Sequence, residues 1–135
     1  MYNYNDLVDK TVLVTGASGD IGHAICGKFL EQGCIVYALY CTNKAQLKEL
    51  QSHHPAGKKL HLLQGDLSNQ EDVAAICAQL SSDKGKLDVL VNNAGIVKDN
   101  LFAAMTFDDF SSVINTNLLG LFRLTKEVLL LLRSA

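Results

Sequence analysis

The chain has 135 residues, of which 48% are apolar and 19% charged, and its net charge at pH 7 is −2. This length suits one domain over residues 1–135, and the charge balance excludes the clustered basic surface of a nucleic-acid-binding protein. The longest aliphatic run, at 128–132, is far too short to span a membrane, so we expect no membrane partner.

Short β-type runs alternate with helix-type runs along the chain. The β-type runs are apolar and rich in β-branched residues, whereas the helix-type runs carry apolar side chains three or four positions apart. This alternation predicts an α/β fold with a parallel sheet that helices cover on both faces. We expect strands at 11–15, 35–40, 60–64 and 88–92, and helices at 24–33, 44–52, 68–80 and 107–133.

Two of these helices start with capping signals. Ser68 and Glu71 have the spacing of a capping box, in which Ser68 would cap the third helix. Thr106 stands in the capping position before the long fourth helix.

The four cysteines lack the spacing of a zinc site, and no histidine lies at a suitable interval, so we expect no metal. We interpret them as reduced cysteines that pack in the interior of a cytoplasmic protein. They are Cys26, Cys34, Cys41 and Cys77.

The turn after the first expected strand is TGASGDIG, residues 15–22. It follows a strand directly and opens a helix, which is the setting in which a glycine-rich turn binds a dinucleotide. Gly16 permits the tight turn, Gly22 lets the helix approach the sheet, and backbone N–H groups between them can bind a pyrophosphate. The alternative is a tight turn that binds no ligand. The candidate cofactor-binding residues are Gly16, Ala17, Ser18, Asp20, Ile21 and Gly22.

This turn resembles the T-G-x-x-x-G-x-G signature of the short-chain dehydrogenases/reductases. It departs at one position, because the middle glycine falls on Asp20 and Gly19 stands one residue earlier. The T-G-x-x-G-x-x-G spacing of the family's extended branch fits better. Asp20 could cap the helix, which the helix dipole favours, but its charge would repel a phosphate if it pointed inward.

Two motifs after later strands carry the same resemblance. QGDLS follows the third expected strand; in this family an aspartate here accepts a hydrogen bond from the adenine amino group, which implies that role for Asp66, with Leu67 beside the ring. The alternative for QGDLS is a simple turn into a helix. LVNNAGI follows the fourth strand and is typical of the family's compact branch. It implies that Ala94 and Gly95 let the backbone approach the cofactor and that Asn93 bonds to backbone and ribose.

The stretch VINTNLLGLF resembles the family's segment that holds an active-site asparagine, and Asn117 matches it. The resemblance implies that Asn117 holds a helical distortion and a water in a proton relay. The preceding stretch GIVKDNLFAAMTFDDF looks most like the β-ketoacyl-ACP (3-oxoacyl-ACP) reductases of the family, although related alcohol dehydrogenases share much of it. This likeness implies NADPH-linked reduction of a 3-oxoacyl thioester, a step of fatty acid biosynthesis.

The end of the second strand bears on the choice between NAD and NADP. NAD-preferring members of the family place Asp or Glu there to bind the ribose 2′-hydroxyl. Here the sequence is YCTNK, residues 40–44, whose hydroxyl, amide and ammonium groups could instead bind a 2′-phosphate. We therefore expect NADP(H) in preference to NAD(H), with Cys41 and Thr42 at the cofactor.

YCTNK also places a tyrosine four residues before a lysine, a spacing used for proton transfer in reductases. Tyr40 ends a strand rather than lying on a helix, so we interpret Tyr40 and Lys44 as a coincidental match. The family's catalytic serine and Tyr-x-x-x-Lys follow a fifth strand and have no counterpart here, which leaves Asn117 as the one expected catalytic residue. We expect this chain alone to be inactive, because carbonyl reduction needs a proton donor. The alternative is a non-catalytic dinucleotide-binding module or pseudoenzyme subunit.

The resemblance covers the N-terminal half of the family's fold. It implies a truncated Rossmann-type doubly wound sheet of about four strands and four helices, in the strand order 3-2-1-4. An apolar parallel edge and a last helix that is apolar on most sides both favour association. We expect self-association through the fourth helix and the edge of the fourth strand, or pairing with a complementary fragment. An acyl thioester would bind only if a C-terminal half completes the fold.

Overall fold

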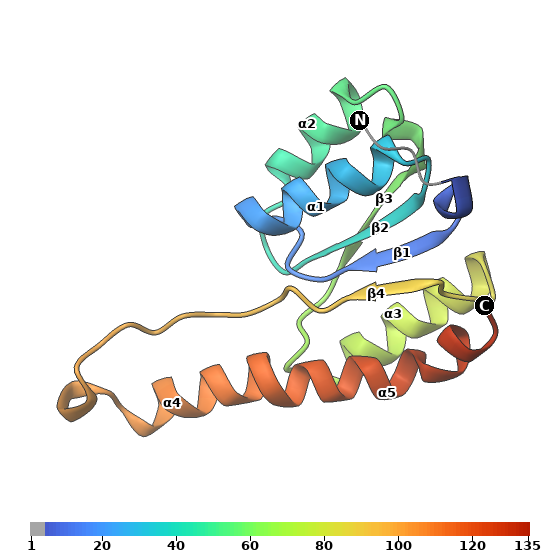
Figure 1. The fold of residues 1–135 in the computed structure, drawn as a ribbon. Helices are drawn as coiled ribbons and strands as arrows, with labels where there is room; N and C mark the ends of the chain where they lie inside the picture. The colour runs from blue at the N-terminus through green and yellow to red at the C-terminus, as the bar shows by residue number, and fades with distance from the viewer. Residues whose placement is uncertain (1–4) are drawn as a thin grey trace.

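The structure, a computed structural model, describes residues 5–135 and contains one parallel sheet (Figure 1). The strand order is β3-β2-β1-β4, which confirms the expected order, and each neighbouring pair runs parallel. The strands are continuously apolar or nearly so because helices cover both faces of such a sheet. They are β1 (Thr11–Val14), β2 (Ile35–Tyr40), β3 (Leu60–Gln64) and β4 (Val89–Val91).

Helices cover the sheet in two layers. In Figure 1, α1 (Asp20–Glu31) and α2 (Ala45–His53) lie on one face, and α3 (Gln70–Asp83) and α5 (Gly120–Arg133) lie on the other. The sheet therefore forms the middle of three layers, which confirms the doubly wound α/β architecture.

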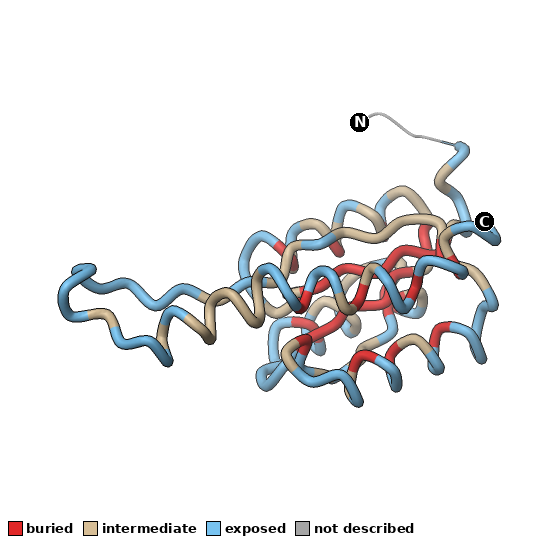
Figure 2. The backbone as a smooth tube through the Cα atoms, turned by 90° about the horizontal axis from the view of Figure 1, so that it is seen from below, coloured by how far each residue is buried: buried red, intermediate tan, exposed pale blue. Residues whose placement is uncertain are grey.

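Two buried clusters, one on each face of the sheet, hold these layers together. Successive strand residues point to opposite faces, so Val12 and Val14 pack toward α1 whereas Leu13 packs toward α3 and α5. Figure 2 shows the buried residues concentrated along the strands and the inner sides of the helices. The carboxyl ends of the strands are thus held in fixed positions by packing on both sides.

The C-terminal helical segment is interrupted by a π-turn. It consists of α4 (Phe107–Ile114), the π-turn η4 (Asn115–Leu119) and α5, which together cover the helix expected at 107–133. At the end of η4 the Gly120 N–H bonds to the C=O of Asn115, five residues back instead of four. The expected fourth helix is therefore one segment with a local widening in its middle.

The connection between β4 and α4 extends away from the sheet together with α4 (Figure 1). It contains the short 3₁₀ helix η3 (Phe102–Ala104) and ends at Thr106, whose Oγ1 accepts a hydrogen bond from the Asp109 N–H at 3.0 Å. This bond confirms the expected cap of the fourth helix. Two more 3₁₀ helices, η1 (Asn5–Leu7) and η2 (Gly57–Lys59), precede β1 and β3.

The start of α3 differs from the expected capping box. The N-cap is Asn69, whose Oδ1 accepts hydrogen bonds from the N–H groups of Glu71 and Asp72. Ser68 does not cap α3, because its hydroxyl and its N–H both donate to the carboxylate of Asp66. The bonds to Asp66 thus hold Ser68 in the turn before α3.

The cysteine expectation holds in part. Cys26 and Cys34 are buried, and burial raises the pKa of the Cys26 thiol to about 12. Cys41 is exposed and Cys77 is half-buried, so interior packing is wrong for Cys41, which lies just beyond the end of β2. Across residues 5–135, no group of His, Cys, Asp or Glu side chains is placed to hold a metal ion. Within the same residues, no helix combines the length and apolarity that a membrane crossing requires.

Candidate functional site

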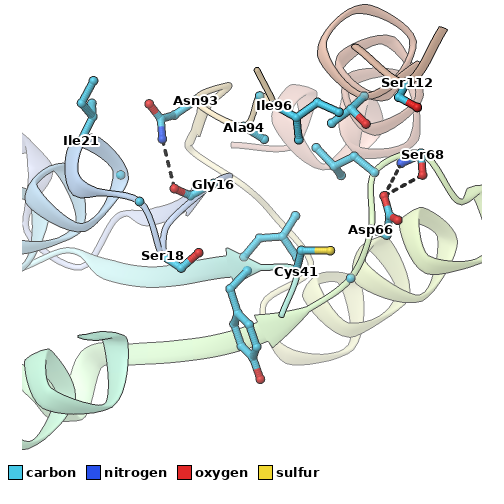
Figure 3. Close-up of a pocket in the computed structure, with 18 of the residues that line it drawn as sticks. Gly16, Ser18, Ile21, Cys41, Asp66, Ser68, Asn93, Ala94, Ile96 and Ser112 are labelled. Carbon is cyan, nitrogen blue, oxygen red and sulfur yellow. Dashed lines mark hydrogen bonds between the residues drawn. The ribbon is translucent and has the colours of Figure 1, made fainter. Parts of the chain in front are cut away.

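The loops that follow the four strands meet at the carboxyl edge of the sheet and enclose a hollow of about 830 Å³. The chain builds outward from β1 to β2 and β3 and then places β4 on the other side of β1, so the order reverses between β1 and β4. Open α/β sheets bind ligands in the crevice at such a reversal. The lining, part of which Figure 3 shows, includes the expected site residues Gly16, Ser18, Asp20, Ile21, Gly22, Cys41, Asp66, Leu67, Asn93, Ala94 and Gly95.

The glycine turn brings the N-terminus of α1 against the hollow. Gly16 has a φ of +61°, which other residues adopt only with strain. A Cβ on Gly22 would lie 2.2 Å from the carbonyl oxygen of Gly16, so only glycine lets the first turn of α1 approach so closely. The N-cap is Gly19, which has no side chain to bond to the first-turn N–H groups. This helix end therefore offers donors and a positive dipole to an anionic group.

Two residues of this turn do not take their expected positions. Ala17 is fully buried, and its N–H donates to the C=O of Leu39 at 3.0 Å, so it anchors the turn to β2 and does not line the hollow. Asp20 is the first residue of α1 and is exposed at the rim. The expectation that Asp20 caps α1 is wrong, because Gly19 occupies the N-cap position.

The loop after β4 is bonded directly to the glycine turn. The Oγ1 of Thr15 accepts hydrogen bonds from the backbone N–H groups of Asn93 and Ala94, at 3.0 and 2.8 Å. The side-chain amide of Asn93 donates to the C=O of Thr15 and of Gly16, both at 3.2 Å, and Figure 3 shows the bond to Gly16. These bonds hold the two loops at a fixed separation on either side of the reversal point.

The turn after β3 holds a carboxylate at the hollow. The Oδ1 of Asp66 accepts hydrogen bonds from the N–H and the hydroxyl of Ser68, at 2.9 and 2.7 Å (Figure 3). Within residues 5–135 no hydrogen bond is donated to Oδ2 of Asp66. This oxygen can therefore accept a hydrogen bond from a ligand. Leu67 beside it is buried, with 6% of its surface exposed, and supplies an apolar wall.

The end of β2 forms the remaining wall. Tyr40 and Cys41 line the hollow, whereas Thr42 is exposed outside it. Burial and the nearby carboxylates of Asp66 and Asp72 raise the pKa of the Cys41 thiol. Tyr40 is the last residue of β2, so it shares no helix face with a lysine.

The comparisons with known proteins identify this arrangement. A family model described as short chain dehydrogenase matches residues 10–135. The chain belongs to the short chain dehydrogenase family. This finding confirms the resemblance that the glycine turn and the LVNNAGI motif indicate, and members of the family bind an NAD(P) dinucleotide.

The relatives of this family member include both sequences and structures. Nodulation protein G from Azospirillum brasilense is 41% identical over 120 residues, which are 88% of this chain and 49% of the relative. The 3-oxoacyl-[acyl-carrier-protein] reductase FabG of Vibrio cholerae is 36% identical over 124 residues, 92% of this chain and 50% of the relative. The structure of Thermoplasma acidophilum aldohexose dehydrogenase superimposes with a TM-score of 0.81 and 30% identity, over 98% of this chain and 48% of that protein. The chain thus spans about half the length of these relatives.

Asn117, which the resemblance implies as the active-site asparagine, lies in the π-turn and does not line the hollow. Its Oδ1 accepts a hydrogen bond from the Ile96 N–H at 2.8 Å, and its amide donates to the Ile96 C=O at 3.0 Å. Asn117 therefore ties the loop after β4 to the widened part of the helix. The helical distortion implied by the resemblance is present at this residue.

The hollow also has lining residues that the sequence analysis did not select. Ser112 and Thr116 come from α4 and η4, and Ile96 and Lys98 come from the loop after β4. Nothing in the local sequence marks Ser112 or Thr116, because their place depends on how α4 and η4 lie against the strand ends. Ser68 carries a local signal, since a serine two residues after an aspartate commonly bonds back to it in a turn.

Proposed function

We propose that this chain is the dinucleotide-binding half of an NADP-dependent reductase of 3-oxoacyl thioesters. The observation that carries the proposal is the single hollow at the β1–β4 reversal, which gathers the glycine turn, the Asp66 turn and the Asn93 loop. The first turn of α1 borders the hollow, and its N-cap Gly19 makes no side-chain cap bond, so the N–H groups of this helix start can bind a pyrophosphate.

The other parts of the dinucleotide follow from this placement. The carboxylate of Asp66 and the apolar surface of Leu67 would bind the adenine. The carboxylate can accept a hydrogen bond from the adenine amino group, and the leucine side chain can contact the face of the ring. The loop of Asn93, Ala94 and Gly95 would lie along the nicotinamide half. When bound, the reduced nicotinamide supplies a hydride to a carbonyl carbon.

The preference for NADP(H) over NAD(H) rests on the end of β2. Cys41 and Thr42 are exposed there, followed by Asn43 and Lys44, and none carries the carboxylate that binds a ribose 2′-hydroxyl. A 2′-phosphate gains hydrogen bonds and charge attraction from such groups. The 3-oxoacyl thioester as substrate is supported by the likeness to a 3-oxoacyl-[acyl-carrier-protein] reductase, with the remainder of the fold supplying the proton donor.

A fluorescence titration of the chain with NADPH and with NADH tests the proposal. NADPH is expected to bind, and to bind more tightly than NADH. A folded sample that binds neither dinucleotide contradicts the assignment of the hollow. A sample that binds NADH more tightly retains the dinucleotide site but contradicts the choice of cofactor.

A second candidate function is a dinucleotide-binding module that does not itself transfer hydride. One observation favours it: among the described lining residues Tyr40 is the one tyrosine, and with 8% of its surface exposed it lies at a strand end. NADPH oxidation in the presence of acetoacetyl-CoA separates the two functions. Because the first proposal takes the proton donor from the remainder of the fold, the assay uses this chain completed by a C-terminal half. Turnover then favours the reductase, whereas dinucleotide binding without turnover favours the module.

We further propose that the chain self-associates and acts in the cytoplasm. Leu124, Val128 and Leu131 of α5 are buried against the sheet layer, but the other sides of the segment 107–133 carry exposed apolar residues beside charged ones such as Lys126 and Glu127. β4 is an edge strand, so its outer side is open to pairing. The exposed apolar residues of the segment are Phe107, Phe110, Leu118, Leu119, Leu121, Phe122, Leu129 and Leu130.

A further inference from the structure

Arg123 joins two walls of the hollow although it does not line the hollow itself. It lies in the first turn of α5 and is half-buried. Its Nη1 donates to the backbone C=O groups of Leu67 and Asn115, both at 3.3 Å. Its Nη2 donates to the side-chain Oδ1 of Asn115 at 2.7 Å. One guanidinium thus connects the turn after β3 with the start of the π-turn.

Both of the segments that Arg123 connects contribute to the hollow. The turn after β3 contributes Asp66, Leu67 and Ser68, and the π-turn contributes Thr116. These segments touch beside Arg123, where a Cβ on Gly120 would lie 3.0 Å from the Cβ of Leu67. The separation of the two walls is therefore set at this contact.

The π-turn needs this support because its backbone bonding is irregular. The Asn115 C=O accepts from the Gly120 N–H, five residues on, and also from Arg123. A planar guanidinium can reach several acceptors in one fixed arrangement, whereas a lysine ammonium acts as a point charge on a flexible stem. The acceptors that Arg123 meets are a side-chain oxygen and two carbonyl oxygens, and they suit the guanidinium geometry.

We propose that Arg123 is a positioning residue that sets the width of one end of the hollow. This end is lined by Asp66 and Leu67, and we call it the nucleoside end. Arg123 acts by holding the turn of Asp66 and Leu67 against the π-turn. This inference rests on the proposed dinucleotide binding, in which that end takes the adenosine. Arg123 is distinct from Asn117, which ties the same π-turn to Ile96 on the loop after β4.

The experiment compares two half-ligands, because loss of folded protein weakens both equally whereas a widened nucleoside end weakens one. Adenosine 2′,5′-bisphosphate is the probe for the nucleoside end, measured by displacement of NADPH, and reduced nicotinamide mononucleotide is the probe for the other end. Arg123→Met removes the donors and keeps an apolar stem. Arg133→Met makes the same change at an exposed residue in the last turn of α5 and is the matched control.

Arg123→Met is expected to weaken NADPH and adenosine bisphosphate binding by about tenfold, since hydrogen bonds from a charged donor are lost. The affinity of the Arg123→Met variant for reduced nicotinamide mononucleotide should equal that of the wild-type chain. Arg133→Met should change the affinity for neither half-ligand. Arg123→Lys should weaken binding as Arg123→Met does, because one ammonium group cannot replace the two guanidinium nitrogens that donate to Leu67 and Asn115. If circular dichroism shows Arg123→Met to be unfolded, Asn115→Ala takes its place, because it removes only the 2.7 Å acceptor.

Unchanged adenosine bisphosphate affinity in the folded variant overturns the inference, and so does an equal loss for both half-ligands. If the wild-type chain binds no dinucleotide at all, the proposed function itself fails and this inference falls with it. The two failures are thus told apart by the wild-type titration.

Discussion

Asn93 donates two hydrogen bonds to Thr15 across the point where the strand order reverses. The Thr15 hydroxyl oxygen accepts from the Asn93 N–H at 3.0 Å, and the Asn93 amide donates to the Thr15 C=O at 3.2 Å. Thr15 is fully buried, so these bonds form away from water. The pair fixes the loop after β4 relative to the glycine turn.

Replacing Thr15 by valine keeps the shape of the side chain and removes the acceptor. The N–H of Ala94 then loses its partner and the N–H of Asn93 keeps only the C=O of Val91, so the free energy of unfolding should fall by about 1–3 kcal/mol. Urea unfolding measures this change. Thr15→Ser, which keeps the hydroxyl, is expected to lose less, and equal losses for the two variants would contradict the role given to the hydroxyl.

Gly22→Ala should damage the site, whereas Gly27→Ala in the same helix should not. A Cβ on Gly22 meets the Gly16 carbonyl oxygen at 2.2 Å, so α1 must shift at a cost of about 1–3 kcal/mol. We expect NADPH binding to weaken accordingly. A Cβ on Gly27 meets nothing within 4 Å, and alanine there should stabilise the helix by up to about 1 kcal/mol. An NADPH titration of both variants checks the contrast, which equal affinities would refute.

Cys41→Asp should move the cofactor preference from NADPH toward NADH. The new carboxylate would stand at the end of β2, where it repels a 2′-phosphate and accepts a hydrogen bond from a 2′-hydroxyl. The ratio of NADPH to NADH affinity should fall by about tenfold, which corresponds to ~1.4 kcal/mol. Cys41→Ser is the control and should keep the ratio. If Cys41→Asp keeps the ratio as well, the adenosine ribose does not lie beside Cys41.

Self-association should depend on the exposed apolar side of α5. Phe122 and Leu130 are 61% and 71% exposed there, and lysine at both positions should prevent burial against a second molecule. Sedimentation velocity at micromolar concentration should show a species larger than a monomer for the wild-type chain and less of it for the double variant. Val8→Lys changes an exposed apolar residue outside α5 and should have no effect. A monomeric wild-type chain contradicts this proposal.

Tyr37 should ionise only at strongly alkaline pH. Desolvation by burial, followed by the hydrogen bond from its hydroxyl to Asp83 at 3.1 Å, raises the pKa of Tyr37 to about 12. Because the folded-state pKa lies above the ordinary value near 10, this tyrosine stabilises the fold below pH 10, and the contribution is lost as the pH rises toward 12. The tyrosinate absorbance of the wild-type chain minus that of Tyr37→Phe gives the titration directly. A midpoint near pH 10 in folded protein contradicts the expectation.

Local patterns in the sequence were enough to predict the strands and the glycine turn, whereas the sheet order and the other site residues followed from the family resemblance. Strand and helix periods are properties of short segments, and a glycine turn between a strand and a helix has few possible conformations. For this reason Gly16 and Gly22 can be selected from the turn itself, whereas Asp66 and Asn93 are selected by the resemblance of their motifs to the family. The expected strand 88–92 differs from β4 only at its ends, where pairing rather than composition decides.

Other features depend on competition between neighbours. Ser68 has the spacing of a capping residue, but Asp66 takes both of its donors, and Asn69 caps α3 instead. Similarly, Thr42 belongs to the selected segment YCTNK, yet only Tyr40 and Cys41 of that segment reach the hollow. A pattern shows which bonds are available, and the folded chain decides which of them forms.

The sequence by itself determined the order of elements and the types of group at each strand end, because both depend on residues close together in the chain. Only the tertiary structure decided which groups share the hollow, which side of the last helix is covered, and that Arg123 bonds to Leu67, 56 residues away. The reason is physical: these contacts are set by the packing of α3 and α5 against the sheet, and no short stretch of sequence encodes the distance between two layers.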